Sequence, residues 1–313
     1  LAALRAEDAG VSDQYLPPFT VVDAAGSPIG AMKDDDAVVI FNFRGDRVVE
    51  IYRALTEEPF TAFARGPLPE NLLVVGMTLY DGDMGIPAHF LVPPTRVTGT
   101  VSELLATAGI AQYAVAETQK FGHVTYFWNG NRSEKFNAQL ETWEEIPSDN
   151  VSFDKLPKMK AKETGDAVVS AIESVKYPFI RCNFAGGDMV GHTGDIPASI
   201  IAVEAIDEAL IRVNAAVKAA KGTLLITADH GNCEVLIERD KNGAPLFDAH
   251  GVAVPKKSHT LSPVPFIAID YSTRTITSGG VSDAGISNIA ATILGLLGQP
   301  IPADYRPTLL SVS

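Results

Sequence analysis

Three short stretches of the sequence carry side chains that could bind a metal ion. GGDMVGHTGD contains Asp188 and His192, TADHGN contains Asp229 and His230, and KKSHTLSP contains His259. A mixed set of carboxylates and imidazoles suits Mn²⁺, Zn²⁺ or Co²⁺ better than Ca²⁺ or Mg²⁺, which prefer oxygen ligands. The number of candidate ligands indicates more than one ion. Two ions a few ångströms apart can clamp a phosphoryl group and activate a nucleophile, as in phosphatases and nucleases.

Each of these stretches also has a plainer interpretation when it is taken alone. Asp188 and His192 could cap a helix. Asp229 could cap a turn beside a surface His230, and His259 could be a surface histidine beside two lysines. His250 is a rival for the third imidazole, because it lies in the segment 238–258, which resembles an inserted hairpin. The metal interpretation therefore depends on whether the fold brings the stretches together.

The secondary-structure elements around these stretches predict that the fold brings them together. Apolar runs at 177–185 and 223–228 indicate buried strands that end just before Asp188 and Asp229. The segment 196–222 between them predicts a long helix that packs one apolar face on a sheet, with residues 200, 203, 206, 210 and 213 on that face. A strand, helix and strand in this order predict a parallel crossover, whose strand ends share one edge of the sheet. A further strand is predicted at 123–130.

The composition and charge of the chain limit its possible domain organisation and binding partners. The chain has 313 residues, a formal net charge of -13 and two cysteines, Cys182 and Cys233. The acidic balance argues against nucleic acid or an anionic membrane as the main partner. Cysteines without a disulfide pattern favour a reducing, cytoplasmic location, and no apolar run approaches the length of a membrane span. A Gly-, Pro- and Thr-rich stretch places a domain boundary near residue 93, which gives domains 1–93 and 94–313.

Two arginines form a second candidate site in the first domain. Arg44 and Arg47 stand at i and i+3 in NFRGDR, after an apolar strand and before the helix predicted at 48–55. Two guanidinium groups in this arrangement could bind a carboxylate or a phosphate bidentately. The alternative is that both arginines are solvent-exposed residues at the start of the helix and bind no ligand.

Five stretches together resemble a known family. NFRGDR, AETQKFGHVTYFWNGN, DMVGHTGD, TADHGN and SHTLSPVP, in this order, resemble the cofactor-independent phosphoglycerate mutases of the alkaline phosphatase superfamily over essentially the whole chain. The long segment 238–258 is similar to the plant and trypanosomatid form. The resemblance implies an α/β fold. Residues 94–313 would form an alkaline-phosphatase-like three-layer α/β/α sandwich with a largely parallel sheet. Residues 1–93 would form the end of a smaller inserted α/β domain that binds substrate.

The same resemblance implies roles for the candidate residues. It assigns one metal to Asp188, His192 and His259. It assigns a second metal to Asp229 and His230, together with an Asp and a nucleophilic Ser from the amino-terminal part of such enzymes. Lys120 matches a lysine beside the transferring phosphoryl group, and Arg44 and Arg47 match arginines of the substrate site.

The implied reaction is the interconversion of 3-phosphoglycerate and 2-phosphoglycerate through a phosphoserine. It takes place in a monomer that closes its two domains over the substrate. It needs two divalent ions, Mn²⁺ or Co²⁺ before Mg²⁺ or Zn²⁺, and no 2,3-bisphosphoglycerate. The Ser and the first metal-binding Asp have no counterpart here, so we expect a carboxy-terminal portion that is inactive without the amino-terminal portion. The alternatives are a metal-dependent phosphohydrolase or phosphopentomutase of the same superfamily, and a fragment that only binds a metal or a partner chain.

Overall fold

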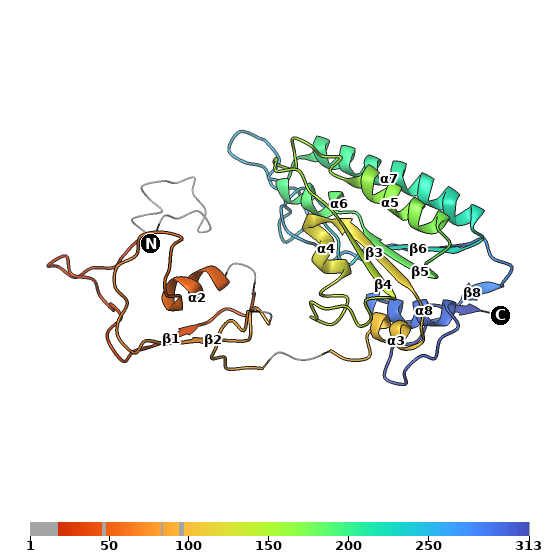
Figure 1. Cartoon of the computed structure of the whole chain (residues 1–313). Helices are drawn as coiled ribbons and strands as arrows, with labels where there is room; N and C mark the ends of the chain where they lie inside the picture. The colour runs from red at the N-terminus through yellow and green to blue at the C-terminus, as the bar shows by residue number, and fades with distance from the viewer. Residues whose placement is uncertain (1–17, 46–47, 83, 94–96, 313) are drawn as a thin grey trace. The chain divides into compact units, whose positions relative to one another are not determined.

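The protein has a mixed α/β fold that divides into two compact units, Leu1–Thr95 and Arg96–Ser313 (Figure 1). The computed structural model describes residues 18–45, 48–82, 84–93 and 97–312. Both units contain parallel strand pairs. Within the described ranges, no helix combines the length and the hydropathy that a membrane span requires.

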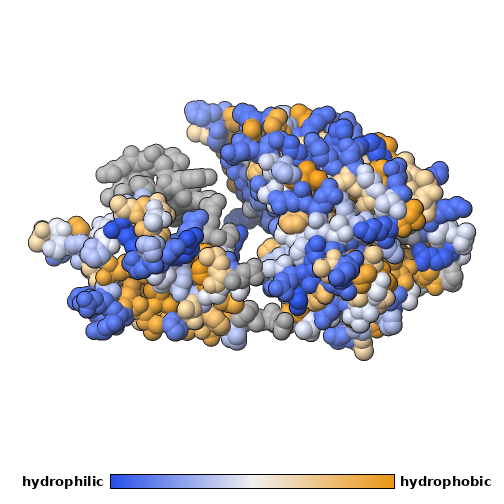
Figure 2. Space-filling model, in the orientation of Figure 1, coloured by the Kyte–Doolittle hydropathy of each residue, from blue (hydrophilic) through white to orange (hydrophobic). Residues whose placement is uncertain are grey.

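The first unit is built on two parallel strands. β1 (Ala37–Ile40) pairs with β2 (Leu73–Gly76), and α2 (Val48–Thr56) connects them. The side chains of Val48 and Tyr52 are buried. β1 ends at Ile40, earlier than the apolar run suggested, and hydrophobic side chains remain exposed on and after it, with Phe41 87% and Phe43 76% exposed. Hydrophobic residues accordingly gather on the visible face of this unit (Figure 2).

The second unit contains a three-stranded parallel sheet in the order β4-β3-β5. The strands are β3 (Gln112–Glu117), β4 (Glu141–Ile146) and β5 (Phe179–Asn183). β3 is paired on both edges, and all six of its residues are buried. Alternation along β3 sends Tyr113 and Val115 to one face and Ala114 and Ala116 to the other.

Helices cover both faces of this sheet. On one face, α5 (Ala161–Glu173) and α7 (Ile196–Ala219) pack Val168, Val213 and Val217 against Tyr113 and Val115. On the other face, α4 (Thr118–Val124) packs Val124 against Ala114 and Ala116. A neighbouring core joins α3 (Val101–Thr107) to α8 (Ile289–Leu296).

The remaining strands form two antiparallel pairs. β6 (Thr223–Thr227) pairs with β7 (Phe266–Asp270), and β8 (Ile276–Ser278) pairs with β9 (Leu310–Val312). The crossover through α7 does not join adjacent strands among the described residues, because β6 takes its hydrogen bonds from β7 and not from β5. Among the described residues, β5 and β6 each have one edge without a strand partner. Three short helical turns complete the unit: α6 (Gly186–Met189), η2 (Gly191–Thr193) and η3 (Ile286–Asn288).

The strand predicted at 123–130 is also wrong. The chain turns directly from β3 into α4, which ends at Val124, and then continues in turns stabilised by hydrogen bonds such as Phe127 N to Gly122 O, 2.9 Å. The apolar and aromatic composition of this segment has a strand propensity. Burial of Lys120 and Val124 on one side of α4, four residues apart, overrides that propensity.

The apolar face expected on α7 is wrong at its amino-terminal half. Ile200 is 54% and Val203 47% exposed, whereas Ala202, Ala205 and Ala209 are buried. The reason is close packing: a Cβ added to Gly186 of α6 would lie 3.4 Å from the Cβ of Ala202, and one added to Gly165 of α5 would lie 3.0 Å from the Cβ of Ala209. Only small side chains fit at these contacts, so the larger residues lie on the outer side of the helix.

Candidate metal centre

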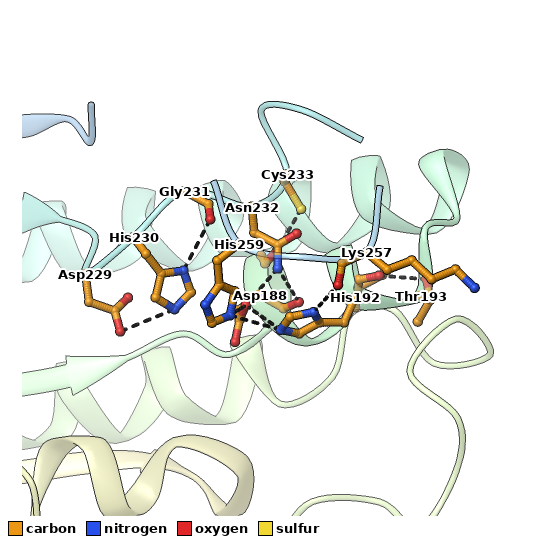
Figure 3. A network of polar contacts seen from close by, with 12 residues as sticks. Asp188, His192, Thr193, Asp229, His230, Gly231, Asn232, Cys233, Lys257 and His259 are labelled. Atoms are coloured by element: carbon orange, nitrogen blue, oxygen red, sulfur yellow. Dashed lines mark hydrogen bonds and ion pairs between the residues drawn. The ribbon is translucent and has the colours of Figure 1, made fainter. Parts of the chain in front are cut away.

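Asp188, His192 and His259 converge on one point of the second unit (Figure 3). Asp188 lies in α6, just after β5; His192 lies in η2; and His259 lies in the loop that leads to β7. The Oδ1 atom of Asp188 is 3.1 Å from His192 Nε2 and 3.0 Å from His259 Nε2. The two Nε2 atoms are 3.0 Å apart. Two of the three stretches that the sequence singles out thus supply one compact set of donor atoms.

The spacing of these three atoms fits a shared metal ion. Ligand atoms that each lie about 2.1 Å from one ion stand about 3.0 to 3.4 Å apart, depending on the coordination geometry. The three observed separations fall at the lower end of that range. One carboxylate oxygen with two imidazole nitrogens is also a ligand set that Mn²⁺, Co²⁺ or Zn²⁺ accepts.

The carboxylate of Asp188 is held from two further sides. Lys120, whose side chain is buried, places Nζ 2.5 Å from Oδ2, and Asn232 donates from Nδ2 to Oδ1 at 2.7 Å. Burial raises the pKa of Asp188, but the hydrogen bonds from Lys120 and Asn232 and the positive charge of Lys120 outweigh it and lower this pKa to about 2. Asp188 is therefore ionised at neutral pH, as a metal ligand must be.

A backbone carbonyl orients His192. Its Nδ1 lies 2.7 Å from the carbonyl oxygen of Lys257, at the exit of the segment 238–258. A carbonyl can only accept, so Nδ1 carries a proton, which leaves Nε2 as the nitrogen that could bind a metal beside Asp188 and His259. The long segment thus contributes to the site through its backbone.

His230 and Asp229 lie beside this set. The ring of His230 stacks on that of His259 at 3.6 Å and 19°, and one ligand atom from each of Asp188, His230 and His259 lies within 4.8 Å of the others. Asp229 is 3.6 Å from His230 Nε2, and its side chain is 55% exposed. A pocket of about 410 Å³ opens next to this pair and is otherwise largely apolar, with Val264, Phe266, Ile286, Ile289 and Leu309 in its lining.

The other sequence candidates lie elsewhere. Arg44 lies in the first unit, on the exposed segment after β1, and Arg47 lies outside the described residues. His250 is exposed in a turn of the segment 238–258, where its backbone N–H donates to Asp248 Oδ1. That segment folds as two successive hairpins, with antiparallel bridges Arg239–Pro245 and Phe247–Ala253.

Sequence reasoning missed two residues near the centre. Asn232 contacts Asp188 directly, yet an amide is not a typical ligand for such ions; its position directly after Asp-His-Gly was the available signal. His123 was placed in a strand but lies on α4. Burial lowers the pKa of His123, the charge of Lys120 lowers it further, and the carboxylates of Asp229 and Asp188 oppose this.

The sequence is similar to a known family of metalloenzymes and to individual phosphoglycerate mutases. Residues 23–301 match the family described as the Metalloenzyme superfamily. The chain is 51% identical to a 2,3-bisphosphoglycerate-independent phosphoglycerate mutase of Trypanosoma brucei brucei, over 100% of this chain and 57% of that protein. It is 46% identical to mutase 1 of Arabidopsis thaliana, over 98% of this chain and 55% of that protein.

A solved structure is similar to the whole chain. A crystal structure of Leishmania mexicana phosphoglycerate mutase at low cobalt concentration superposes with a TM-score of 0.87 and 46% identity, covering 100% of this chain and 57% of that one. The chain therefore spans little more than half the length of the relatives it matches.

Proposed function

We propose, since this chain belongs to the metalloenzyme superfamily, that it forms the metal-binding part of an enzyme that interconverts 3-phosphoglycerate and 2-phosphoglycerate. The observation that carries the proposal is the convergence of Asp188 Oδ1 with the Nε2 atoms of His192 and His259 at 3.0 to 3.1 Å. Its similarity to phosphoglycerate mutases supplies the substrates. The proposal includes an alkaline-phosphatase-like three-layer sandwich for 94–313 and the end of an inserted substrate-binding domain for 1–93.

In this proposal Asp188, His192 and His259 hold one divalent ion, and Asp229 and His230 supply half of the ligands of a second. Mn²⁺ or Co²⁺ is the favoured ion, with Mg²⁺ or Zn²⁺ as alternatives, and 2,3-bisphosphoglycerate is not required. When bound, such ions lower the pKa of a serine hydroxyl and balance the charge of a phosphoryl group. The Leishmania mutase structure was obtained at low cobalt concentration, which supports this choice of metal.

Lys120 and the arginines act on the substrate in this proposal. The ammonium of Lys120 is already fixed beside Asp188, at 2.5 Å, and is buried, so it would add positive charge next to a transferring phosphoryl group with little reorganisation. Arg44 and Arg47 would bind the anionic groups of the substrate within the inserted domain.

The partner required by this proposal is the amino-terminal portion of the same enzyme. Two features support it: the chain spans 57% of its trypanosomal relative, and β5 and β6 each have an edge without a strand partner among the described residues. Leu224, Leu225 and Ile226 in β6 are only half-buried, whereas every residue of the fully paired β3 is buried. We further propose that the enzyme is a monomer located in the cytoplasm, on the basis of the resemblance alone.

An activity assay tests this function. The chain is assayed alone and mixed with the amino-terminal portion of the trypanosomal relative, with Mn²⁺ or Co²⁺ and without 2,3-bisphosphoglycerate. We expect conversion of 3-phosphoglycerate to 2-phosphoglycerate only in the mixture. This activity should be lost when the chain carries His259→Ala and retained when it carries His250→Ala. Release of inorganic phosphate without 2-phosphoglycerate would indicate a phosphohydrolase instead, and a folded, metal-loaded mixture without either activity would reject the proposal.

A further inference from the structure

Asn232 links two of the segments that carry candidate ligands. It follows His230 by two residues and is buried, 5% exposed. Its Nδ2 donates to the Oδ1 atom of Asp188 at 2.7 Å and to the backbone oxygen of the same residue at 3.1 Å. One amide group thus fixes both the carboxylate and the main chain of Asp188 to the segment after β6 (Figure 3).

Glu234 links the same segment to the third one. Its Oε2 accepts a hydrogen bond from the backbone N–H of Asn232 at 2.7 Å, and its Oε1 accepts one from the hydroxyl of Thr260. Thr260 directly follows His259, and its own N–H donates to the carbonyl of Gly231 at 3.0 Å. His259 is therefore tied to the segment of His230 by a side-chain and a backbone connection.

The packing around these connections leaves no room for larger residues. A Cβ added to Gly191, the residue before His192, would lie 2.8 Å from Cγ of Asn232. A Cβ added to Gly231 would collide with the Thr260 hydroxyl and the Glu234 carboxylate. A larger residue at either position would therefore force the side chains of Asn232, Thr260 or Glu234 to shift.

We propose that Asn232, Glu234 and Thr260 form a bracket of positioning residues that holds the three ligand-bearing segments in register before a metal binds. The inference rests on the metal site of the proposed function. Asp188 and His192 come from one segment and His259 from another, so without the bracket both segments would lose conformational freedom when the ion binds. Residues that orient metal ligands in this way change metal affinity by about 10- to 100-fold when they are removed.

Cobalt binding to the purified chain tests the bracket independently of activity. Co²⁺ is titrated into the metal-free protein by calorimetry, and the visible absorption of the bound ion is recorded. We expect Asn232→Ala to weaken Co²⁺ binding by about 10- to 100-fold and to alter the absorption bands. Thr260→Val, which keeps the shape but removes the hydroxyl that donates to Glu234, should cause a smaller loss in the same direction.

A matched control separates positioning from general destabilisation. Asn214→Ala removes an amide of α7 that accepts a hydrogen bond from Tyr271 at 3.0 Å, outside the bracket. It should lower the thermal stability of the metal-free chain without changing Co²⁺ affinity or the absorption bands. If Asn232→Ala does not fold, Thr260→Val carries the test.

The outcomes distinguish the bracket from the metal site itself. If the unaltered chain binds no Co²⁺ at this set of residues, the metal site fails and the bracket fails with it. If the unaltered chain binds Co²⁺ and both bracket variants bind it with unchanged affinity and absorption, the metal site stands and the bracket is overturned, whatever their thermal stability.

Discussion

At the scale of single residues, the two exposed histidines His259 and His250 offer a direct contrast. His259 lies 3.0 Å from Asp188, whereas His250 lies in a turn of the segment 238–258. We predict that His259→Ala weakens Co²⁺ binding by more than about 100-fold, because it removes a ligand rather than a supporting contact. His250→Ala should leave the affinity unchanged. Calorimetric titration checks both variants, and an equal effect of the two would contradict the assignment.

The pKa of Asp188 makes a prediction about stability in acid. A carboxyl whose pKa falls from 3.8 to about 2 on folding stabilises the protein above pH 3.8, and this contribution is lost as the pH falls through about 2. Its size is on the order of 2 kcal/mol, since each tenfold change in proton affinity corresponds to about 1.4 kcal/mol. The difference in unfolding free energy between the metal-free protein and Asp188→Asn should therefore shrink from pH 4 to pH 2. Urea unfolding at several pH values measures it, and a constant difference would count against the prediction.

The residue types made part of the centre predictable. Asp188, His192 and His259 stand out in the sequence as ligand types at the ends of predicted elements, and the structure brings them together. Asn232, Glu234 and Thr260 do not stand out, because amides, hydroxyls and exposed carboxylates occur on every surface. Their role arises from contacts between distant segments, which local patterns do not encode.

At the scale of elements, the contact between α5 and α7 depends on small side chains. Ala209 is fully buried against Gly165, whereas Ala215 on the same helix is exposed. We predict that Ala209→Leu destabilises the protein by about 1 to 3 kcal/mol through overpacking. Ala215→Leu should change stability by less than about 0.5 kcal/mol. Chemical denaturation of both variants checks this, and similar values for the two would show that the contact is not tight.

The errors in predicting elements have a common cause. The large apolar residues of α7 predict its buried face, but alanines form that face because α5 and α6 approach closely. The strand propensity of the apolar run at 123–130 predicts a strand, but the chain leaves β3 directly into α4. In both cases tertiary packing decided the outcome, and a single sequence does not contain its geometry.

At the scale of the whole molecule, the open edges of β5 and β6 lead to a prediction about backbone protection. β3 is paired on both sides, whereas β5 and β6 are each paired on one side among the described residues. We predict that adding the amino-terminal portion slows amide hydrogen exchange in β5 and β6 by about 10-fold or more and leaves β3 nearly unchanged. Uniform slowing, or none, would contradict docking at these edges.

Asp188, His192 and His259 are proposed to bind one divalent ion. The most direct measurement is a crystal structure of the chain grown with Co²⁺, with anomalous data collected at the cobalt edge. We predict an anomalous peak within bonding distance of Asp188 Oδ1 and of the Nε2 atoms of His192 and His259. Well-ordered side chains at these three residues with no anomalous peak among them would contradict it.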